Sequence, residues 1–305
     1  MVEGGCSHYV FNAVYGLQFR FWNIRIADRG GEDSIVFAGN TKLFCMEGMA
    51  IVVVSVEESS QKLLQSCAKS QSRTDLWIEF IRSVRIRRMV EVGVYQGDFA
   101  ESVLRHCESV TTYYMVDPWR HLDHWNKPSN QSDAVFEEFL RKTKERTEFA
   151  ANRRVILRGK TTDVIDQIPD GELDFAYIDG DHTLKGIAID LIRAFPKVKL
   201  GGYIGGDDFT PNMWQHKTRF EPTLVCPFAV YFAEAVEAEI YALPYSQFCL
   251  RKTEQKNFKF IDLTGQYGDL QLRSQLAPKR MLKLSLGERF PRLMRVLGKA
   301  RRLVS

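Results

Sequence analysis

The chain has 305 residues, of which 45% are hydrophobic and 26% charged, as is usual for one large or two modest globular domains. The net charge of +4 is uneven, because residues 279–305 carry nine Lys or Arg against one Glu. The rest of the chain is therefore mildly acidic and offers no evident basic groove, so we expect no nucleic-acid partner.

Three further absences restrict the class of protein. No apolar run approaches the roughly 18–20 residues that span a bilayer. Residues 1–9 lack the basic-then-apolar layout of a secretory signal. The six cysteines form no CxxC pair. We therefore expect a cytoplasmic protein with reduced thiols rather than a disulfide or zinc scaffold.

The N-terminal region, residues 1–73, is predicted to be a separate extension. Residues 8–26 and 34–56 are rich in aromatic and β-branched side chains, which favours strands. A helical pattern follows from residue 57 to 83. We find no chemistry in this extension, and predict a cap or a contact within a homo-oligomer.

Residues 74–252 alternate between strand and helix patterns, which favours an α/β fold: a Rossmann-like, doubly wound, mostly parallel sheet of seven strands. The predicted strands are residues 88–92, 113–116, 155–157, 173–178, 202–204, 239–243 and 247–251. The predicted helices between them are residues 99–106, 133–150, 162–167, 184–195 and 228–238.

A glycine-containing turn joins the first of these strands to its helix. Gly93 and Gly97 are separated by three residues, so the turn is not the GxGxxG dinucleotide motif, but it lets a ligand approach the backbone. Asp117 ends the next strand, about 20 residues on, where a carboxylate can accept hydrogen bonds from ribose. Trp119 could pack on the nucleoside or anchor its loop, and Thr161 could face the purine edge.

Two acidic clusters follow two later strands: Asp179-Gly180-Asp181-His182 and Gly205-Gly206-Asp207-Asp208. Since the carboxyl ends of parallel strands meet at one edge, these carboxylates should lie close together and repel each other. A hard divalent cation such as Mg²⁺ would relieve that repulsion. Asp181 is more simply a helix cap. A nucleoside site beside an acidic site favours S-adenosylmethionine over NAD or ATP.

From residue 75 to 252 the chain resembles the class I S-adenosylmethionine-dependent methyltransferases, and more narrowly the metal-dependent small-molecule O-methyltransferases. Within those it is similar to the bacterial group that includes enzymes methylating macrolide sugar hydroxyls. The motifs that carry the resemblance are Val90-Glu91-Val92-Gly93-Val94-Tyr95-Gln96-Gly97, Val116-Asp117-Pro118-Trp119, Tyr177-Ile178-Asp179-Gly180-Asp181-His182 and Gly201-Gly202-Tyr203-Ile204-Gly205-Gly206-Asp207-Asp208.

The resemblance implies roles for individual residues. S-adenosylmethionine would contact Glu91, Gly93, Tyr95, Gly97, Asp117, Trp119, Thr161 and Asp179. Mg²⁺ or a similar ion would be held by Asp179, Asp207 and Asp208; the alternative is that one of the last two points away from the ion and braces the loop. His182 would be the base that deprotonates the acceptor, or would act only by hydrogen bonding to a group that contacts it.

The expected function is methyl transfer to a hydroxyl of a small molecule, a sugar or glycosylated metabolite. Alternatives are a catechol-like phenol or a protein as acceptor, an NAD-dependent dehydrogenase, and a non-catalytic scaffold. The basic tail, residues 253–305, is expected to be a solvated extension rather than a membrane-surface contact, because Pro291 interrupts its amphipathic pattern.

Overall fold

The computed structural model describes residues 24–25, 34–37, 41–44, 52–254, 257–268 and 272–291, with side chains from residue 60 onward. Packing divides the chain into two units, Met1–Cys67 and Ala68–Ser305. The first unit contains an antiparallel sheet in the order β1-β2-β3-β4, followed by α1. Its elements are β1 (Ile24–Arg25), β2 (Ser34–Phe37), β3 (Thr41–Phe44), β4 (Val52–Ser55) and α1 (Val56–Cys67).

Most of the predicted strand-rich start, residues 8–26, lies outside the described residues, as does the end of the basic tail. Strands β2 to β4 fall within the predicted stretch 34–56. The use of this unit as a cap or oligomer contact stays a prediction.

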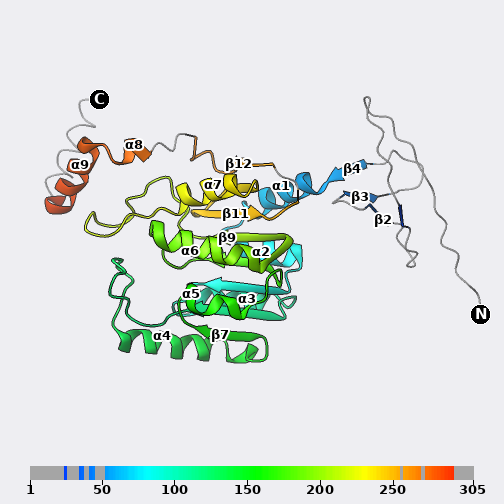
Figure 1. The fold of residues 1–305 in the computed structure, drawn as a ribbon, viewed down its shortest axis with the longest axis horizontal. Coiled ribbons are helices and arrows are strands. Elements are labelled where there is room, and N and C mark those ends of the chain that lie inside the picture. The colour runs from blue at the N-terminus through cyan, green and yellow to red at the C-terminus, as the bar shows by residue number, and fades with distance from the viewer. Residues whose placement is uncertain are drawn as a thin grey trace, which may run out of the picture. The chain divides into compact units, whose positions relative to one another are not determined.

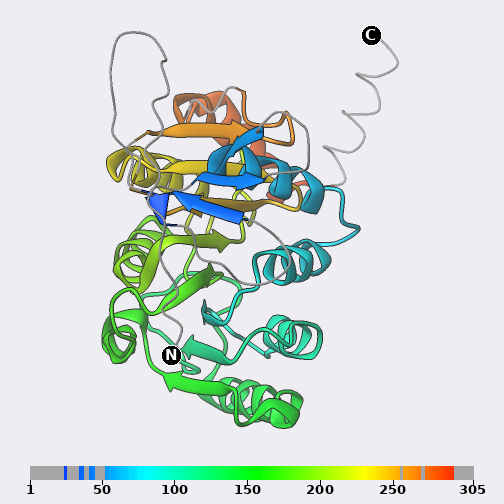
Figure 2. The same cartoon turned by 90° about the vertical axis from the view of Figure 1, so that its right-hand side faces the viewer.

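The second unit is built on an eight-stranded sheet in the order β12-β10-β11-β9-β8-β5-β6-β7, from the orange β12 at one edge to the green β7 at the other (Figure 2). Only β11 runs antiparallel to its neighbours. The strands are β5 (Arg88–Val92), β6 (Thr112–Asp117), β7 (Arg154–Arg158), β8 (Leu173–Ile178), β9 (Val198–Gly206), β10 (Glu239–Leu243), β11 (Gln247–Arg251) and β12 (Lys259–Asp262).

This sheet confirms the predicted Rossmann-like architecture. All seven predicted strands are present, and β12 adds an eighth beyond residue 252 by pairing in parallel with β10. The predicted helical stretch 57–83 is two helices, because residues 68–72 form a turn between α1 and α2.

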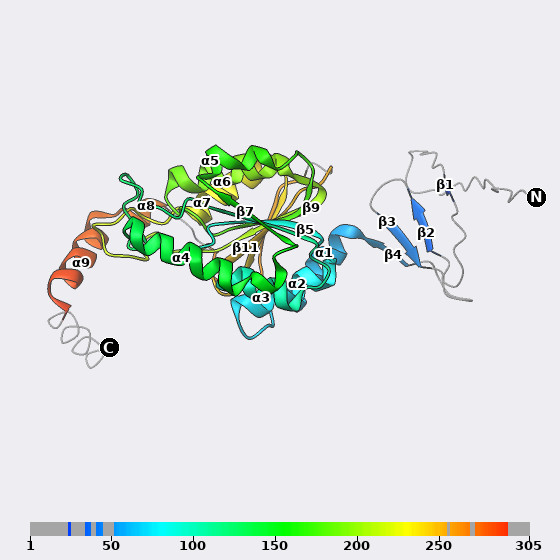
Figure 3. The same ribbon diagram turned by 90° about the horizontal axis from the view of Figure 1, so that it is seen from below.

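Helices cover both faces of the sheet. Helices α2, α3 and α4 lie on one face, and α5, α6 and α7 on the other (Figure 3). They are α2 (Arg73–Val84), α3 (Asp98–His106), α4 (Asp133–Arg146), α5 (Thr161–Val164), α6 (Leu184–Ala194) and α7 (Val225–Ala235), with short 3-10 turns at Glu148–Ala150, Ile165–Gln167 and Phe195–Lys197.

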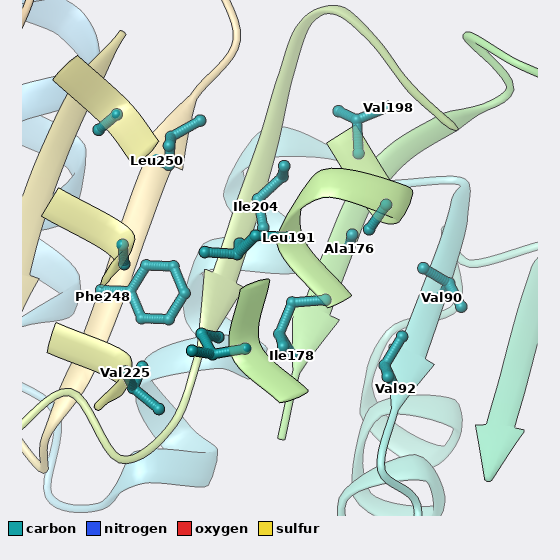
Figure 4. Close-up of a cluster of buried hydrophobic side chains, with 14 of the residues drawn as sticks. Val90, Val92, Ala176, Ile178, Leu191, Val198, Ile204, Val225, Phe248 and Leu250 are labelled. Carbon is teal, nitrogen blue, oxygen red and sulfur yellow. The ribbon is translucent and has the colours of Figure 1, made fainter. Parts of the chain in front are cut away.

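The main core lies between the sheet and helices α5 to α7 (Figure 4). Alternate residues of each central strand enter it, as the two-residue period of a strand requires. Buried examples are Val90, Val92, Ala176, Ile178, Ile204, Leu191 and Val225. The intervening strand residues face α2 and α3, where Phe175 and Tyr177 pack against the ring of Trp77. Removing this much apolar surface from water stabilises the sheet.

The C-terminal part of the described chain is helical, with α8 (Leu272–Gln275) and α9 (Pro278–Arg289). None of the helices among the described residues is both long and apolar enough to cross a membrane. The solvated extension stays a prediction for the tail, and membrane-surface contact remains its alternative.

Candidate active site at the carboxyl edge of the sheet

The turn between β5 and α3 packs directly against the end of β8. Gly93 has φ of +89°, and a Cβ atom there would lie 2.1 Å from the carbonyl oxygen of Asp179. Only glycine fits such a position without moving backbone. Gly97 also has a positive φ, +78°, and begins α3. The predicted cofactor turn and the first acidic cluster are therefore adjacent.

Asp117 shapes that turn. Its Oδ2 accepts hydrogen bonds from the backbone N–H groups of Val94 and Tyr95, each at 2.9 Å, and its Oδ1 accepts from the N–H of Trp119 at 2.7 Å. Burial raises the pKa of Asp117, although these three donors stabilise its charged form. The carboxylate holds the two loops together, and its contact with ribose stays a prediction.

The remaining predicted cofactor residues differ in exposure. Glu91 is buried, and its Oε2 accepts a hydrogen bond from Tyr113 at 2.8 Å. Trp119 is also fully buried and donates from Nε1 to the carbonyl of Tyr95, so it anchors its loop. The side chain of Tyr95 is 41% exposed, and Thr161 is buried with its hydroxyl donating to Asp190. Tyr95 is thus the one most open to a ligand among these four.

The second acidic cluster meets an arginine that the sequence did not single out. The Nη1 atom of Arg73, at the start of α2, lies 3.3 Å from Asp179 Oδ2 and also contacts Asp207 Oδ2. Burial opposes the guanidinium charge, but Tyr177 and the two carboxylates raise the pKa of Arg73 above its usual value. Burial and the neighbouring Asp179 raise the pKa of Asp207 to about 6, in spite of Arg73.

His182 joins the third aspartate to the first. Its Nδ1 contacts Asp208 Oδ2, and its Nε2 lies 3.3 Å from Asp179 Oδ1. Burial opposes the charged ring, but the two carboxylates outweigh it and raise the pKa of His182 to about 10. The same ion pair lowers the pKa of Asp208 to about 2 against the effect of burial.

One ring nitrogen of His182 is incompletely satisfied. Although Nε2 is close enough to Asp179 for an ion pair, it is buried and has no hydrogen bond of good geometry among the described residues. An unpaired buried polar atom costs free energy unless a ligand or water satisfies it. Asp208 itself adopts a left-handed backbone conformation, φ +56°, of the kind that recurs at functional sites.

Every carboxylate oxygen of the three aspartates faces a donor from the chain. Asp179 faces Arg73 and His182. Asp207 contacts Arg73 through Oδ2, and its Oδ1 accepts from Gln247 Nε2 and from the N–H of Asp208. Asp208 contacts His182 through Oδ2, and its Oδ1 accepts from Gln215 Nε2 at 3.0 Å.

Asp181 plays a different part from its neighbours, close to the one predicted. Its Oδ1 accepts from the N–H of Thr183 at 2.9 Å and from Trp125 Nε1 at 3.0 Å. The N-cap of α6 is Thr183, whose hydroxyl accepts from the N–H of Gly186. Asp181 therefore supports the cap and ties the loop after β6 to the site.

Residues 90–209 match the family model described as a methyltransferase domain. This match spans the glycine turn, Asp117 and both acidic clusters, in the order in which the fold brings them together. Over these residues the second unit carries a methyltransferase domain. The match therefore favours a methyltransferase over the alternatives of an NAD-dependent dehydrogenase and a non-catalytic scaffold. Comparison with curated proteins finds no match.

Solved structures with similar chain traces are distant in sequence. One is the O-methyltransferase NovP, with 18% identity and a TM-score of 0.45 over 65% of this chain and 81% of that one. Another is an O-methyltransferase from Bacillus cereus in complex with S-adenosylhomocysteine, with 15% identity and a TM-score of 0.44 over 63% of this chain and 90% of that one. A third is the S-adenosylhomocysteine-bound methyltransferase PaMTH1 from Podospora anserina, with 13% identity and a TM-score of 0.43 over 68% of this chain and 100% of that one.

The predicted Mg²⁺ ligands, as they are arranged in this domain, do not fit a divalent ion. Among the described residues, no group of three or more His, Cys, Asp or Glu side chains is arranged to hold a metal ion. Asp179, Asp207 and Asp208 do converge, but their oxygens face Arg73, His182, Gln215 and Gln247. A divalent ion needs several of those oxygens free and turned toward one point.

Sequence reasoning missed Arg73, Gln247 and Asp190. Arg73 is one of several arginines near α2, and it lies more than 100 residues from both carboxylates that it contacts. Gln247 looks like an ordinary strand residue. The mid-helix position of Asp190 within an otherwise apolar stretch was the one available signal.

Proposed function

We propose that this domain transfers the methyl group of S-adenosylmethionine to a hydroxyl of a small molecule, with a sugar or glycosylated metabolite as the acceptor. The observation that carries the proposal is the packing of Gly93 against Asp179. It sets the predicted cofactor turn beside a cluster of carboxylates and a histidine that can face an acceptor oxygen. Such adjacency suits an in-line displacement, in which positioning supplies much of the rate.

In the reaction, the acceptor oxygen attacks the methyl carbon, a carbon–oxygen bond forms, and the carbon–sulfur bond breaks with its electrons returning to sulfur. The hydroxyl proton passes to the group formed by His182 with Asp179 and Asp208. Because His182 contacts both carboxylates, we assign the proton to the group rather than to one atom. S-adenosylhomocysteine then leaves as a neutral thioether.

Replacing His182 tests this assignment. His182→Gln should lower kcat by about 10²–10⁴-fold, the usual contribution of a positioned acid or base, because the acceptor proton loses its route. Binding of S-adenosylhomocysteine, measured by calorimetry, should change little. The control is His106→Gln, since His106 is exposed on α3 and bonds only the carbonyl of Ser102 among the contacts described. Full activity in His182→Gln would contradict the proposed role.

The acceptor is identified from its product. Incubating the protein with methyl-labelled S-adenosylmethionine and a panel of glycosides, catechols and proteins, followed by mass spectrometry, should place the label on an oxygen of a glycoside. Label on a phenol or on a protein would select one of the two alternative acceptors. Absence of S-adenosylmethionine binding would sink the proposal as a whole.

A further inference from the structure

The three aspartates at the ends of β8 and β9 pose an electrostatic problem. Like charges held close together in a partly buried site repel strongly unless a positive charge lies among them. The chain itself provides two such charges, Arg73 between Asp179 and Asp207, and His182 between Asp179 and Asp208. Arg73, in contact with two of the three carboxylates, offsets part of their negative charge.

We propose that Arg73 occupies the place that a divalent cation would take in this domain, so that the methyltransferase needs no bound divalent ion. Arg73 is then a positioning residue, which holds Asp179 and Asp207 at a fixed separation. The part of the inference that concerns activity rests on the proposed function. The part that concerns ion binding does not.

The contact geometry supports this substitution. A single nitrogen, Nη1, approaches both Asp179 Oδ2 and Asp207 Oδ2, so it lies between the two carboxylates. A shared oxygen-liganded ion would have to lie in that same space. Arginine suits the role because its guanidinium stays charged and its fork presents several donors to carboxylates.

The helix that carries Arg73 is held against the sheet by packing, although the Arg73 side chain itself is 39% exposed. Its helix, α2, begins at the N-cap Ser72, whose hydroxyl accepts from the N–H of Asp75. Four residues after Arg73, the ring of Trp77 is fully buried. A Cβ atom at Gly205 would lie 2.2 Å from that ring, so glycine at this position lets α2 approach the sheet.

A hydrogen-bond bridge ties this helix to the same aspartate. Gln247 Oε1 accepts from Trp77 Nε1 at 2.8 Å, and Gln247 Nε2 donates to Asp207 Oδ1. Asp207 is thus bound to α2 twice, directly by Arg73 and indirectly through Gln247 and Trp77. Moving Arg73 aside to admit an ion would break the direct connection and leave only the bridge through Gln247.

The test is Mn²⁺ binding to the full-length protein without acceptor, measured by electron paramagnetic resonance and calorimetry. The wild-type protein and Arg73→Lys, which keeps the charge, should not bind Mn²⁺ at the cluster. Arg73→Gln should gain Mn²⁺ affinity by at least about tenfold, since it frees carboxylate oxygens and removes the positive charge. Arg82→Gln, on the same helix but outside the cluster, should behave like wild type.

Three outcomes would overturn the inference. The first is Mn²⁺ binding by the wild type that Asp207→Asn abolishes. The second is an Arg73→Gln protein that still binds S-adenosylhomocysteine, and so is folded, but gains no Mn²⁺ affinity. The third is methyl transfer that stops in EDTA and returns with Mg²⁺. Failure to methylate any hydroxyl would instead count against the proposed function, because Mn²⁺ binding is measured without turnover.

Discussion

At the scale of single residues, Asp190 has an environment unusual for a carboxyl group. It lies in α6, is buried, and accepts a hydrogen bond from Thr161 Oγ1 at 2.6 Å. A Cβ atom at Gly180 would come within 2.8 Å of its Oδ2, so it packs beneath the first acidic cluster. Burial raises the pKa of Asp190 to about 7, in spite of the Thr161 hydrogen bond.

This shift makes the stability depend on pH with a definite sign. The folded protein holds the Asp190 proton more tightly than the unfolded chain, so Asp190 costs nothing below about pH 4 and progressively destabilises the fold up to about pH 7. Asp190→Asn removes that cost. The free energy of unfolding of Asp190→Asn relative to wild type should therefore increase between pH 4 and pH 8, by up to about 4 kcal/mol.

Urea titrations of both proteins at several pH values measure this difference directly. Asp163→Asn is a suitable control, because Asp163 is exposed on α5, close to Thr161 in sequence. Its difference from wild type should stay flat over the same pH range. A flat difference for Asp190→Asn would show that the carboxyl ionises normally in the folded state.

At the scale of elements, helix α2 is tied to the sheet by Gln247 on β11. The carboxamide oxygen of Gln247 accepts from both Trp77 Nε1 and Tyr177 OH, and both donors are buried. Its amide nitrogen reaches Asp207. One side chain therefore satisfies polar groups of α2, β8 and the loop after β9, and sets the distance between Arg73 and the carboxylates.

Gln247→Met keeps the volume but leaves Trp77 Nε1 and Tyr177 OH buried without an acceptor. We expect a loss of about 3 kcal/mol in the free energy of unfolding, because each orphaned group costs about 1–3 kcal/mol. Urea unfolding followed by tryptophan fluorescence measures it. Gln167→Met, at an exposed position, should change stability by no more than about 0.5 kcal/mol. If Gln247→Met also lowered the free energy of unfolding by no more than about 0.5 kcal/mol, the proposed contribution of the Gln247 hydrogen bonds would be refuted.

At the scale of the whole second unit, three segments distant in sequence meet beside the carboxyl edge of the sheet. The loop after β6 is held to the loop after β9 by Lys127, whose Nζ donates to the carbonyl of Glu221 at 2.9 Å. The loop after β9 is held in turn by α9, where Arg280 donates to Asn212 and Glu288 accepts from Thr218 (Figure 1). We expect these loops to border the acceptor in the proposed reaction.

Loosening α9 should therefore affect acceptor binding and spare the cofactor. In the double variant Arg280→Gln/Glu288→Gln, we expect the KM of the acceptor to rise about tenfold, since exposed hydrogen bonds of this kind contribute about 0.5–1.5 kcal/mol each. The dissociation constant of S-adenosylhomocysteine should stay unchanged. Lys283→Gln, on the same helix, is the matched control. An equal loss of affinity for S-adenosylhomocysteine would contradict the prediction that α9 affects acceptor binding alone.

Local patterns were sufficient to predict most of the architecture. Strands β5, β8, β10 and β11 have the bounds that the apolar runs predicted, and the order of glycine turn, Asp117 and acidic clusters predicted a methyltransferase domain. These features are encoded within a few neighbouring residues, so periodicity and turn chemistry reveal them. The roles of the predicted site residues stay predictions.

The sequence by itself determined that three carboxylates would gather at one edge of a parallel sheet and need positive charge among them. Only the tertiary structure decided where that charge comes from. Arg73 and Asp207 are 134 residues apart. Their contact depends on the packing of Trp77 over Gly205 and on the reach of Gln247, which no local pattern encodes.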